Sequence, residues 1–282
     1  MENHKKVKAL HLDSMRSWVR TEATAREFFL GVVLNGKKLI TMPCSPEDPE
    51  ALAVGLLASR GIISSKEEIE EISFDEASGI IRISATENKK GNGKIFSEDF
   101  LRTGYGRDVG GYDDIDFKMK VLSNIRLTRE DVLSLYRRFQ GSSDLYRETH
   151  AVHSAALCDT REILVFAEDI GRHNAVDKII GRCILDGIGF TNRMLLISGR
   201  ISAEIIFKAA GFNIPVVISK SAPTDTGVDL ARKLGITLIG FVYQSGMNVY
   251  AGEERMDRPR LLMGRKFSDA QTERVSAVSC GQ

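Results

Sequence analysis

The second half of the chain alternates between apolar strand-like runs and helix-like segments, and this alternation restricts the possible folds most. Six runs between residues 151 and 251 are apolar and rich in β-forming residues: AVHSAALC, EILVFAE, RMLLIS, IPVVIS, ITLIGFVY and NVYA. Helical segments are predicted at 174–187, 202–212 and 224–235. Strands that are apolar along their whole length are usually covered on both faces. We therefore expect an α/β core over residues 128–252, with a mostly parallel sheet flanked by helices.

The first half of the chain predicts a smaller α+β lobe over residues 25–127. Asn35-Gly36 joins the β-rich runs FLGVVLN and KKLITM. This dipeptide is a strong hairpin signal because both of its residues must accept a positive φ. The runs IEEISFD and GIIRIS predict a second hairpin around the sequence EASG.

A helix is expected between these two hairpins. Asp48 is its predicted cap, Pro49 suits the first helical position, and Gly61 suits a left-handed exit. Leu52 and Leu56 stand four residues apart and indicate one apolar face, which we expect to pack on the first hairpin.

Three further segments have less regular patterns. Residues 1–24 predict a polar, irregular N-terminal arm, and residues 253–282 predict a charged tail. Residues 85–126 are polar and Gly-rich, which is typical of a loop that is either disordered or functional. Thr128 and Asp131 form a capping pair that opens a helix. The apolar face of this helix consists of Val132, Leu135, Tyr136 and Phe139.

Composition excludes several classes of function. The chain has 39 Lys and Arg against 38 Asp and Glu, a balance that argues against a nucleic-acid partner. No run approaches the ~20 apolar residues of a membrane span, and no secretory signal is evident, so we expect a cytoplasmic protein without a membrane partner. The four cysteines are widely spread without a Cys-x-x-Cys pair, so neither a zinc site nor any other metal site is expected.

Three predicted strand-to-helix junctions share one design. They lie at residues 168–174, 198–202 and 219–224, and each contains a cation: Arg172, Arg200 or Lys220. Helix N-termini bind phosphates, and the carboxyl ends of parallel strands meet at one edge of a sheet. We therefore expect a site for a diphosphate-bearing nucleotide there. Its predicted binding residues are Arg172, His173, Asn174, Ser198, Gly199, Arg200 and Ser202.

An alternative explanation of the same residues stays open. Arg172 could pair with Asp177, and Glu204 with Lys208 would form an ordinary helical ion pair. His173 would then be a buried, hydrogen-bonded residue rather than part of a ligand site.

The remaining candidate groups have structural interpretations. His153 is flanked by small apolar residues and is interpreted as a core histidine. Cys44 precedes a helix whose dipole could lower the pKa of the thiol, and the alternative is a small buried hydrophobic residue. Cys158 and Cys183 are interpreted as core residues, and Cys280 as part of the tail.

Long motifs connect the chain to a known family. EDIGRHNAVDKIIG, SGRISAEIIFKAAGF and THAVHSAAL resemble the formate dehydrogenase accessory sulfurtransferases (the FdhD family), over about residues 22–250. The resemblance implies an α/β fold with a cytidine-deaminase-like core and a cytoplasmic homodimer. It implies formate dehydrogenase and a cysteine desulfurase as partners. The bound cargo would be molybdenum bis(molybdopterin guanine dinucleotide), here Mo-bisMGD, whose molybdenum receives sulfur from the desulfurase.

The resemblance also carries over two sets of site residues. A family cofactor-binding segment falls on Phe241, Val242, Tyr243, Gln244, Ser245 and Gly246. Alignment of the glycines places the two cysteines of the family's Cys-Gly-x-Cys motif at Tyr105 and Asp108. Neither a phenol nor a carboxylate can carry sulfane sulfur, and Cys44 is the candidate substitute.

Three hypotheses follow from these residues. The first is a sulfurtransferase-type accessory protein. The second is a non-catalytic protein that binds or delivers the cofactor, because the persulfide cysteines are absent. The third is a different nucleotide-binding enzyme on the same scaffold.

Overall fold

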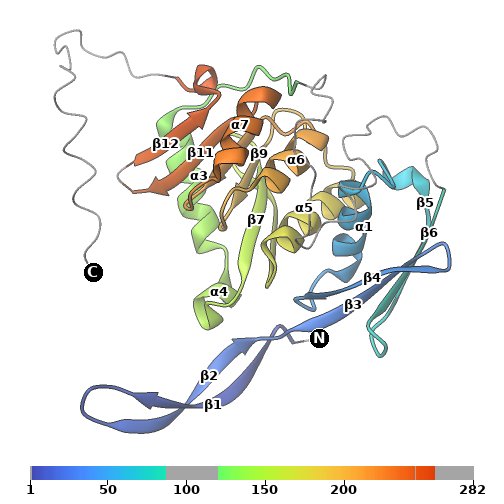
Figure 1. The fold of residues 1–282 in the computed structure, drawn as a ribbon, viewed down its shortest axis with the longest axis vertical. Coiled ribbons are helices and arrows are strands. Elements are labelled where there is room, and N and C mark those ends of the chain that lie inside the picture. The colour runs from blue at the N-terminus through green and yellow to red at the C-terminus, as the bar shows by residue number, and fades with distance from the viewer. Residues whose placement is uncertain (1, 87–119, 245, 258–282) are drawn as a thin grey trace.

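The computed structural model describes residues 2–86, 120–244 and 246–257, which form a mixed α/β structure with three sheets (Figure 1). The largest sheet has six strands in the order β12-β11-β10-β9-β7-β8. Its strands are β7 (His153–Cys158), β8 (Ile163–Asp169), β9 (Met194–Ile197), β10 (Val216–Ser219), β11 (Thr237–Tyr243) and β12 (Gly246–Ala251). All six strands coincide with runs that the sequence predicts.

The expectation of a mostly parallel sheet is wrong at both edges. Within this sheet, direct parallel pairing occurs only between β9 and β10 and between β10 and β11. β7 is antiparallel to both β8 and β9, and β12 is antiparallel to β11. The connections after β7 and β11 are too short for a crossover, which takes a dozen residues or more, so they can only form hairpins. β8, β9, β10 and β11 nevertheless point the same way, and their carboxyl ends share one edge.

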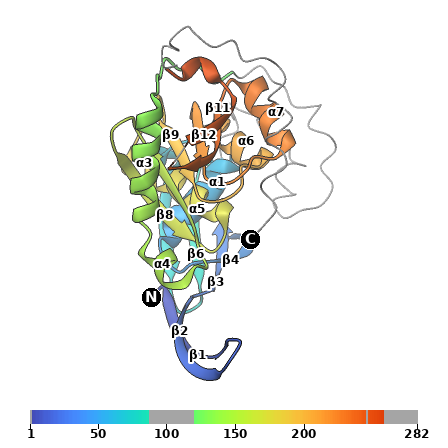
Figure 2. The same ribbon diagram turned by 90° about the vertical axis from the view of Figure 1, so that its left-hand side faces the viewer.

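Helices cover both faces of this sheet, as its uniformly apolar strands predict. They are α3 (Arg129–Gly141), α4 (Asp144–Thr149), α5 (Arg172–Asp186), α6 (Ala203–Gly211) and α7 (Asp225–Leu234). Leu195 and Val217 belong to the core cluster that includes α5, α6 and α7, whereas Leu196 and Val216 belong to the cluster under α3. Figure 2 shows α3 on the side opposite to α6 and α7. The predicted capping box of α3 is confirmed.

The N-terminal lobe is a four-stranded sheet in the order β4-β3-β6-β5 with one long helix, α1 (Pro49–Ser59), and a short helix, η1 (Lys66–Glu68). Its strands are β3 (Phe28–Leu34), β4 (Lys37–Cys44), β5 (Ile69–Asp75) and β6 (Ile80–Ala85). Both predicted hairpins are confirmed. Asn35 and Gly36 have φ values of 48° and 78°, as a two-residue turn with two positive φ angles requires.

Two expectations about α1 are wrong. Its residues from Ala51 to Ser59 are all buried, because the helix lies against both the four-stranded sheet and α5 rather than on one hairpin. Asp48 adopts a left-handed φ of 52° and makes no side-chain cap; its carboxylate pairs with Arg182 of α5 instead. The left-handed exit at Gly61 is confirmed, with φ 67°.

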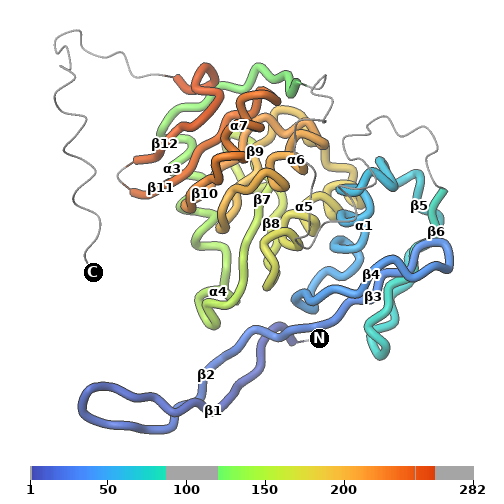
Figure 3. Tube along the Cα trace, viewed as in Figure 1, coloured from blue at the N-terminus to red at the C-terminus, as the bar shows by residue number. Residues whose placement is uncertain are grey.

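The N-terminal arm is not irregular, contrary to the prediction. β1 (His4–Leu12) and β2 (Ser17–Ala25) pair along nine residues as an antiparallel hairpin. Asp13 fixes its turn, because its carboxylate accepts hydrogen bonds from the backbone N–H groups of Met15 and Arg16. The hairpin extends away from the rest of the protein (Figure 3). The sequence analysis did not predict β1, because charged residues in this segment obscure the strand-like alternation of Val7, Ala9 and His11.

The predicted division at residues 24, 127 and 252 and the similarity to cytidine deaminases stay predictions. No helix within residues 2–86, 120–244 and 246–257 is long and apolar enough to cross a membrane.

The contact between α1 and α5 depends on two glycines. A Cβ atom on Gly55 would lie 1.8 Å from the carbonyl oxygen of Asp177, and one on Gly181 would lie 1.9 Å from that of Ala51. The two helix backbones therefore touch, and this contact joins the N-terminal lobe to the six-stranded sheet.

We predict that Gly55→Ala destabilises the protein by about 3 kcal/mol or more, because the methyl group forces two packed backbones apart. Urea unfolding measures the change. Gly141→Ala is the matched control, because nothing lies within 4 Å of a Cβ at that helical position, and it should be neutral or slightly stabilising. Equal stability of the two variants would contradict the close contact.

Candidate functional site

The predicted junctions meet at one edge of the six-stranded sheet, here called the rim. The rim comprises the carboxyl ends of β8, β9, β10 and β11 and the amino end of β7. Ser221 Oγ donates a hydrogen bond to the Ser198 carbonyl at 3.0 Å, and Ser219 Oγ donates one to the Gly199 carbonyl at 2.7 Å. A Cβ on Gly199 would lie 3.4 Å from the Arg172 side chain. The prediction that these junctions share an edge is confirmed.

The cations at the rim are available to an anion to different degrees. Within the described residues, the buried Nε of Arg172 has no hydrogen-bond partner. The Lys220 ammonium lies 5.4 Å from the centre of the Tyr146 ring, as a cation–π contact. Arg200 is exposed.

The alternative explanation by local ion pairs holds only in part. Asp177 does not pair with Arg172, because its carboxylate lies 2.7 Å from Lys208 and accepts a 2.6 Å hydrogen bond from Ser59. Glu204 lies 3.9 Å from Lys208, so the expected helical pair is present. The Arg172 side chain therefore forms no ion pair with Asp177 within α5, and it remains at the rim.

His153 is a rim residue rather than a core residue. It starts β7, and its Nδ1 lies 3.3 Å from Ser198 Oγ. Burial and the nearby Arg172 cation lower the pKa of His153, which favours a neutral imidazole. The sequence predicts the strand but not the place of His153 at the rim. That place depends on the antiparallel pairing of β7 with β9, which brings the amino end of β7 beside the carboxyl end of β9.

His173 forms a half-buried pair with Glu204. The Nδ1 atom lies 3.4 Å from Glu204 Oε1. Burial, together with the cations Lys208 and Arg172, lowers the pKa of His173 to about 3. Burial also raises the pKa of Glu204. The low pKa makes the imidazole neutral at pH 7, so the contact is not an ion pair there.

A buried polar network lies beneath the rim. Asp169 forms a 2.7 Å ion pair with Lys178 and accepts hydrogen bonds from the backbone N–H groups of Ser45 and Gly171. The Asn174 amide donates to Asp169 at 2.9 Å and to the carbonyl of Pro43, also at 2.9 Å. Asn174 is only 3% exposed, so its side chain supports the rim from below instead of facing a ligand as predicted.

The described cysteines are not reactive thiols. Cys44 is fully buried, and burial together with the Asp169 carboxylate raises its pKa to about 12. The favoured interpretation of Cys44 as a small buried hydrophobic residue is therefore confirmed, and the helix dipole does not lower the pKa of its thiol. Burial also raises the pKa values of Cys158 and Cys183 to about 12, which agrees with their interpretation as core residues. Tyr105, Asp108 and Cys280 lie outside the described residues.

Aromatic side chains border the rim at the end of β11. Phe241 has a left-handed φ of 51°, and its N–H donates to the Ser221 carbonyl at 3.4 Å. The ring centre of Phe241 lies 6.4 Å from that of Tyr243 and 6.5 Å from that of Tyr250. Strained backbone in a non-glycine residue often marks a functional site. Of the segment that the resemblance carried over, Val242 is buried and Ser245 lies outside the described residues.

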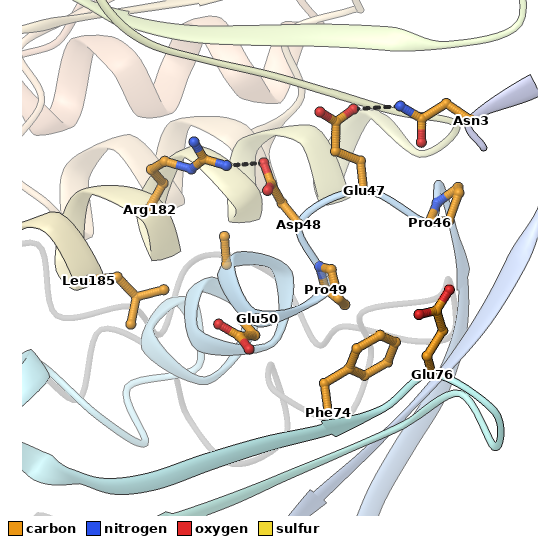
Figure 4. A pocket seen from close by; sticks show the side chains of 11 residues that line it. Asn3, Pro46, Glu47, Asp48, Pro49, Glu50, Phe74, Glu76, Arg182 and Leu185 are labelled. Atoms are coloured by element: carbon orange, nitrogen blue, oxygen red, sulfur yellow. Dashed lines mark hydrogen bonds and ion pairs between the residues drawn. The ribbon is translucent and has the colours of Figure 1, made fainter. Parts of the chain in front are cut away.

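A separate hollow of about 570 Å³ lies between the loop before α1, the β5–β6 turn and α5 (Figure 4). Glu47, Glu50 and Glu76 line it, and the Asp48–Arg182 pair crosses one side. Its acidic lining opposes phosphate binding.

Comparisons with known proteins identify the family of this chain. A model of the FdhD/NarQ family matches residues 25–257. The chain belongs to the FdhD/NarQ family. The protein named sulfur carrier protein FdhD from Bacillus subtilis (strain 168) is 38% identical over 232 residues, covering 82% of this chain and 88% of that protein. The protein of the same name from Listeria monocytogenes serovar 1/2a is 34% identical over 258 residues, covering 90% and 98%.

A solved structure of another protein supports the fold. It comes from Desulfotalea psychrophila and is provisionally assigned as a formate dehydrogenase accessory protein. It superposes with a TM-score of 0.75 at 26% identity, covering 91% of this chain and all of that one.

We predict that His173 makes this FdhD/NarQ family member less stable in acid. Its folded pKa of about 3 lies below the unfolded value of ~6.5, so the neutral form contributes stability above pH ~6.5 that is lost as the pH falls toward the folded pKa. Between pH 7 and pH 5 this loss amounts to about 2 kcal/mol, and His173→Gln should not show it.

Urea unfolding at the two pH values measures the difference between wild type and variant. His150→Asn, at the exposed end of α4, is the control and should keep the wild-type pH dependence. A wild-type pH dependence in His173→Gln would contradict a neutral His173 imidazole in the folded protein.

Proposed function

We propose that this chain is an accessory protein of formate dehydrogenase that holds Mo-bisMGD at the rim as cargo. The observation that carries the proposal is the convergence of Arg172, the Ser198-Gly199 turn and Lys220 at one edge of the sheet. Family membership and the names of the relatives support the accessory role.

Several rim groups suit the diphosphate of a guanine dinucleotide. The buried Arg172 Nε and Ser202 Oγ both lack a hydrogen-bond partner within the described residues. Both stand at helix N-termini, where free N–H groups and the helix dipole favour an anion. Gly199 has no side chain to keep a phosphate away from the backbone. These groups would bind and orient the diphosphate.

The aromatic border suits the guanine base. Phe241 is 36% exposed and Tyr243 is 56% exposed. Exposed rings offer faces on which a planar base stacks. The base would thus lie over the end of β11 while its diphosphate lies at Arg172 and Gly199.

The second candidate concerns sulfur. In a persulfide relay, a thiolate attacks the terminal sulfur of a desulfurase persulfide and displaces the desulfurase thiolate, so the sulfur moves on as a new persulfide. Tyr105 and Asp108 occupy the motif positions, and the three described cysteines are buried with pKa values near 12. We therefore favour a protein that binds or delivers the cofactor without carrying its sulfur, with the relay from a cysteine desulfurase as the family role.

The remaining parts of the proposal concern the surroundings of the protein. Formate dehydrogenase is the proposed recipient, the cytoplasm the proposed compartment and a homodimer the proposed assembly. The family resemblance supports each of them.

We predict that Arg172→Ala and Arg200→Ala each weaken the binding of guanosine diphosphate by about 1–3 kcal/mol, because each removes a charge-assisted hydrogen bond. Isothermal titration calorimetry measures the affinity. Arg161→Ala is the matched control, since this exposed arginine lies in the β7–β8 loop at the opposite edge of the sheet. Unchanged affinity in both rim variants would exclude the rim as the nucleotide site.

We predict that the wild-type chain gains no reductant-releasable ³⁵S label from a cysteine desulfurase and labelled cysteine. Tyr105→Cys/Asp108→Cys should gain the label if these positions match the family motif, and Cys44→Ala should behave as wild type. Label on the wild-type chain would instead support the relay function.

Expression in cells that lack their own accessory factor, with an assay of formate oxidation, then shows whether activation needs the introduced cysteines.

A further inference from the structure

The tip of the β1–β2 hairpin carries large apolar side chains that no described residue covers. Leu10 is 63% exposed, Leu12 67%, Met15 93% and Val19 64%. Soluble proteins seldom group such side chains at the surface unless they form an interaction site. Figures 1 and 2 both show the hairpin extending away from the sheets and helices. Residues 1–24 also lie outside the part of the chain that the family model matches.

The root of the hairpin is tied to the rest of the protein. Asn3 donates a 2.8 Å hydrogen bond to Glu47, and the N–H of Arg26 donates one to the Asn3 carbonyl at 2.9 Å. His4 Nδ1 lies 3.6 Å from Glu148 of α4. The hairpin is therefore presented from an anchored base.

β1 has an open, basic edge. Among the described strands it pairs only with β2, so its outer N–H and C=O groups have no ladder partner there. Lys5, Lys6 and Lys8 are exposed, and the strand contains no carboxylate. Unpaired strand edges bind other strands unless charge or shape prevents it.

β5 has an open edge of the opposite charge. It is the outermost strand of the four-stranded sheet in the described structure. Residues 67–76 contain six carboxylates and no Lys or Arg, and Glu70, Glu71 and Asp75 are exposed within the strand. Like charges oppose pairing of β5 with another β5, whereas the lysines of β1 complement it.

We propose that β1 of one copy of this chain adds to β5 of a second copy as an antiparallel strand. Strand addition would give the open edges their backbone hydrogen bonds, and alternate side chains would set the register. A register that places Lys8 opposite Glu71 also places Val7 opposite Ile72 and the exposed Leu10 opposite Ile69. In this register Lys8 faces an opposite charge and Val7 and Leu10 face apolar side chains, whereas Lys6 lies opposite Ser73 and Ala9 opposite Glu70. This contact rests on the homodimer of the proposed function, to which it gives a specific interface, and it does not depend on the rim.

Sedimentation velocity of the full chain over a range of concentrations tests the proposal. We expect wild type to self-associate, and more weakly as salt rises from 0.05 to 0.5 M, because salt screens the paired charges. Lys6→Glu/Lys8→Glu and Glu70→Lys/Glu71→Lys should each weaken association at least about tenfold. An equimolar mixture of the two variants should restore it, because each hairpin then meets a β5 edge of opposite charge.

The matched control is Lys37→Glu/Lys38→Glu, which reverses two exposed lysines of β4 and makes the same change in net charge. It should associate as wild type does. A monomeric wild-type chain would overturn the proposal. Wild-type association in either hairpin or β5 variant, weakened association in the control, or no recovery in the mixture would also overturn it.

Discussion

The Asp169 carboxylate at the end of β8 lies 2.7 Å from the Lys178 ammonium of α5, and both side chains are almost completely buried. Two charges in a protein interior are tolerated only when hydrogen bonds replace their lost water. Asp169 receives such bonds from Ser45, Gly171 and Asn174, and Lys178 donates to the Glu168 carbonyl. These partners come from the loop before α1, the end of β8 and the start of α5. One ion pair thus fixes the chain at the point where the N-terminal lobe meets the rim.

This network explains why the residues of GRHNAVDK, a part of the motif EDIGRHNAVDKIIG, have different roles. Gly171, Asn174, Asp177 and Lys178 serve the interior, where they bind Asp169, Lys208 and neighbouring backbone. Arg172 and His173 lie above them and belong to the rim. The interior residues hold the first turn of α5 in place, and that turn positions the arginine. The Gly55–Gly181 contact acts at a larger scale, because it sets how closely α1 can approach α5.

The rim and the sulfur chemistry are separable in this family member. The rim depends on cations, turns and helix ends, and the described structure supplies all of these. A persulfide relay depends on an accessible thiolate, and burial denies that state to Cys44, Cys158 and Cys183 by raising their pKa values. Cofactor binding without a relay is therefore consistent with both the motif positions at Tyr105 and Asp108 and the environment of the remaining thiols.

Local signals determined much of this protein from sequence alone. The Asn35-Gly36 turn, the Thr128/Asp131 cap and the apolar core strands depend on neighbours a few residues away, and the structure has each of them where the pattern predicts it. Long sequence motifs alone predicted the family to which the chain belongs. Tertiary structure alone decided that His153 lies at the rim, that Asn174 faces inward and that the pKa of Cys44 rises. The physical reason is that burial, desolvation and ion pairing depend on residues more than a hundred positions apart, such as Ser45 and Asp169, which only the folded chain brings together.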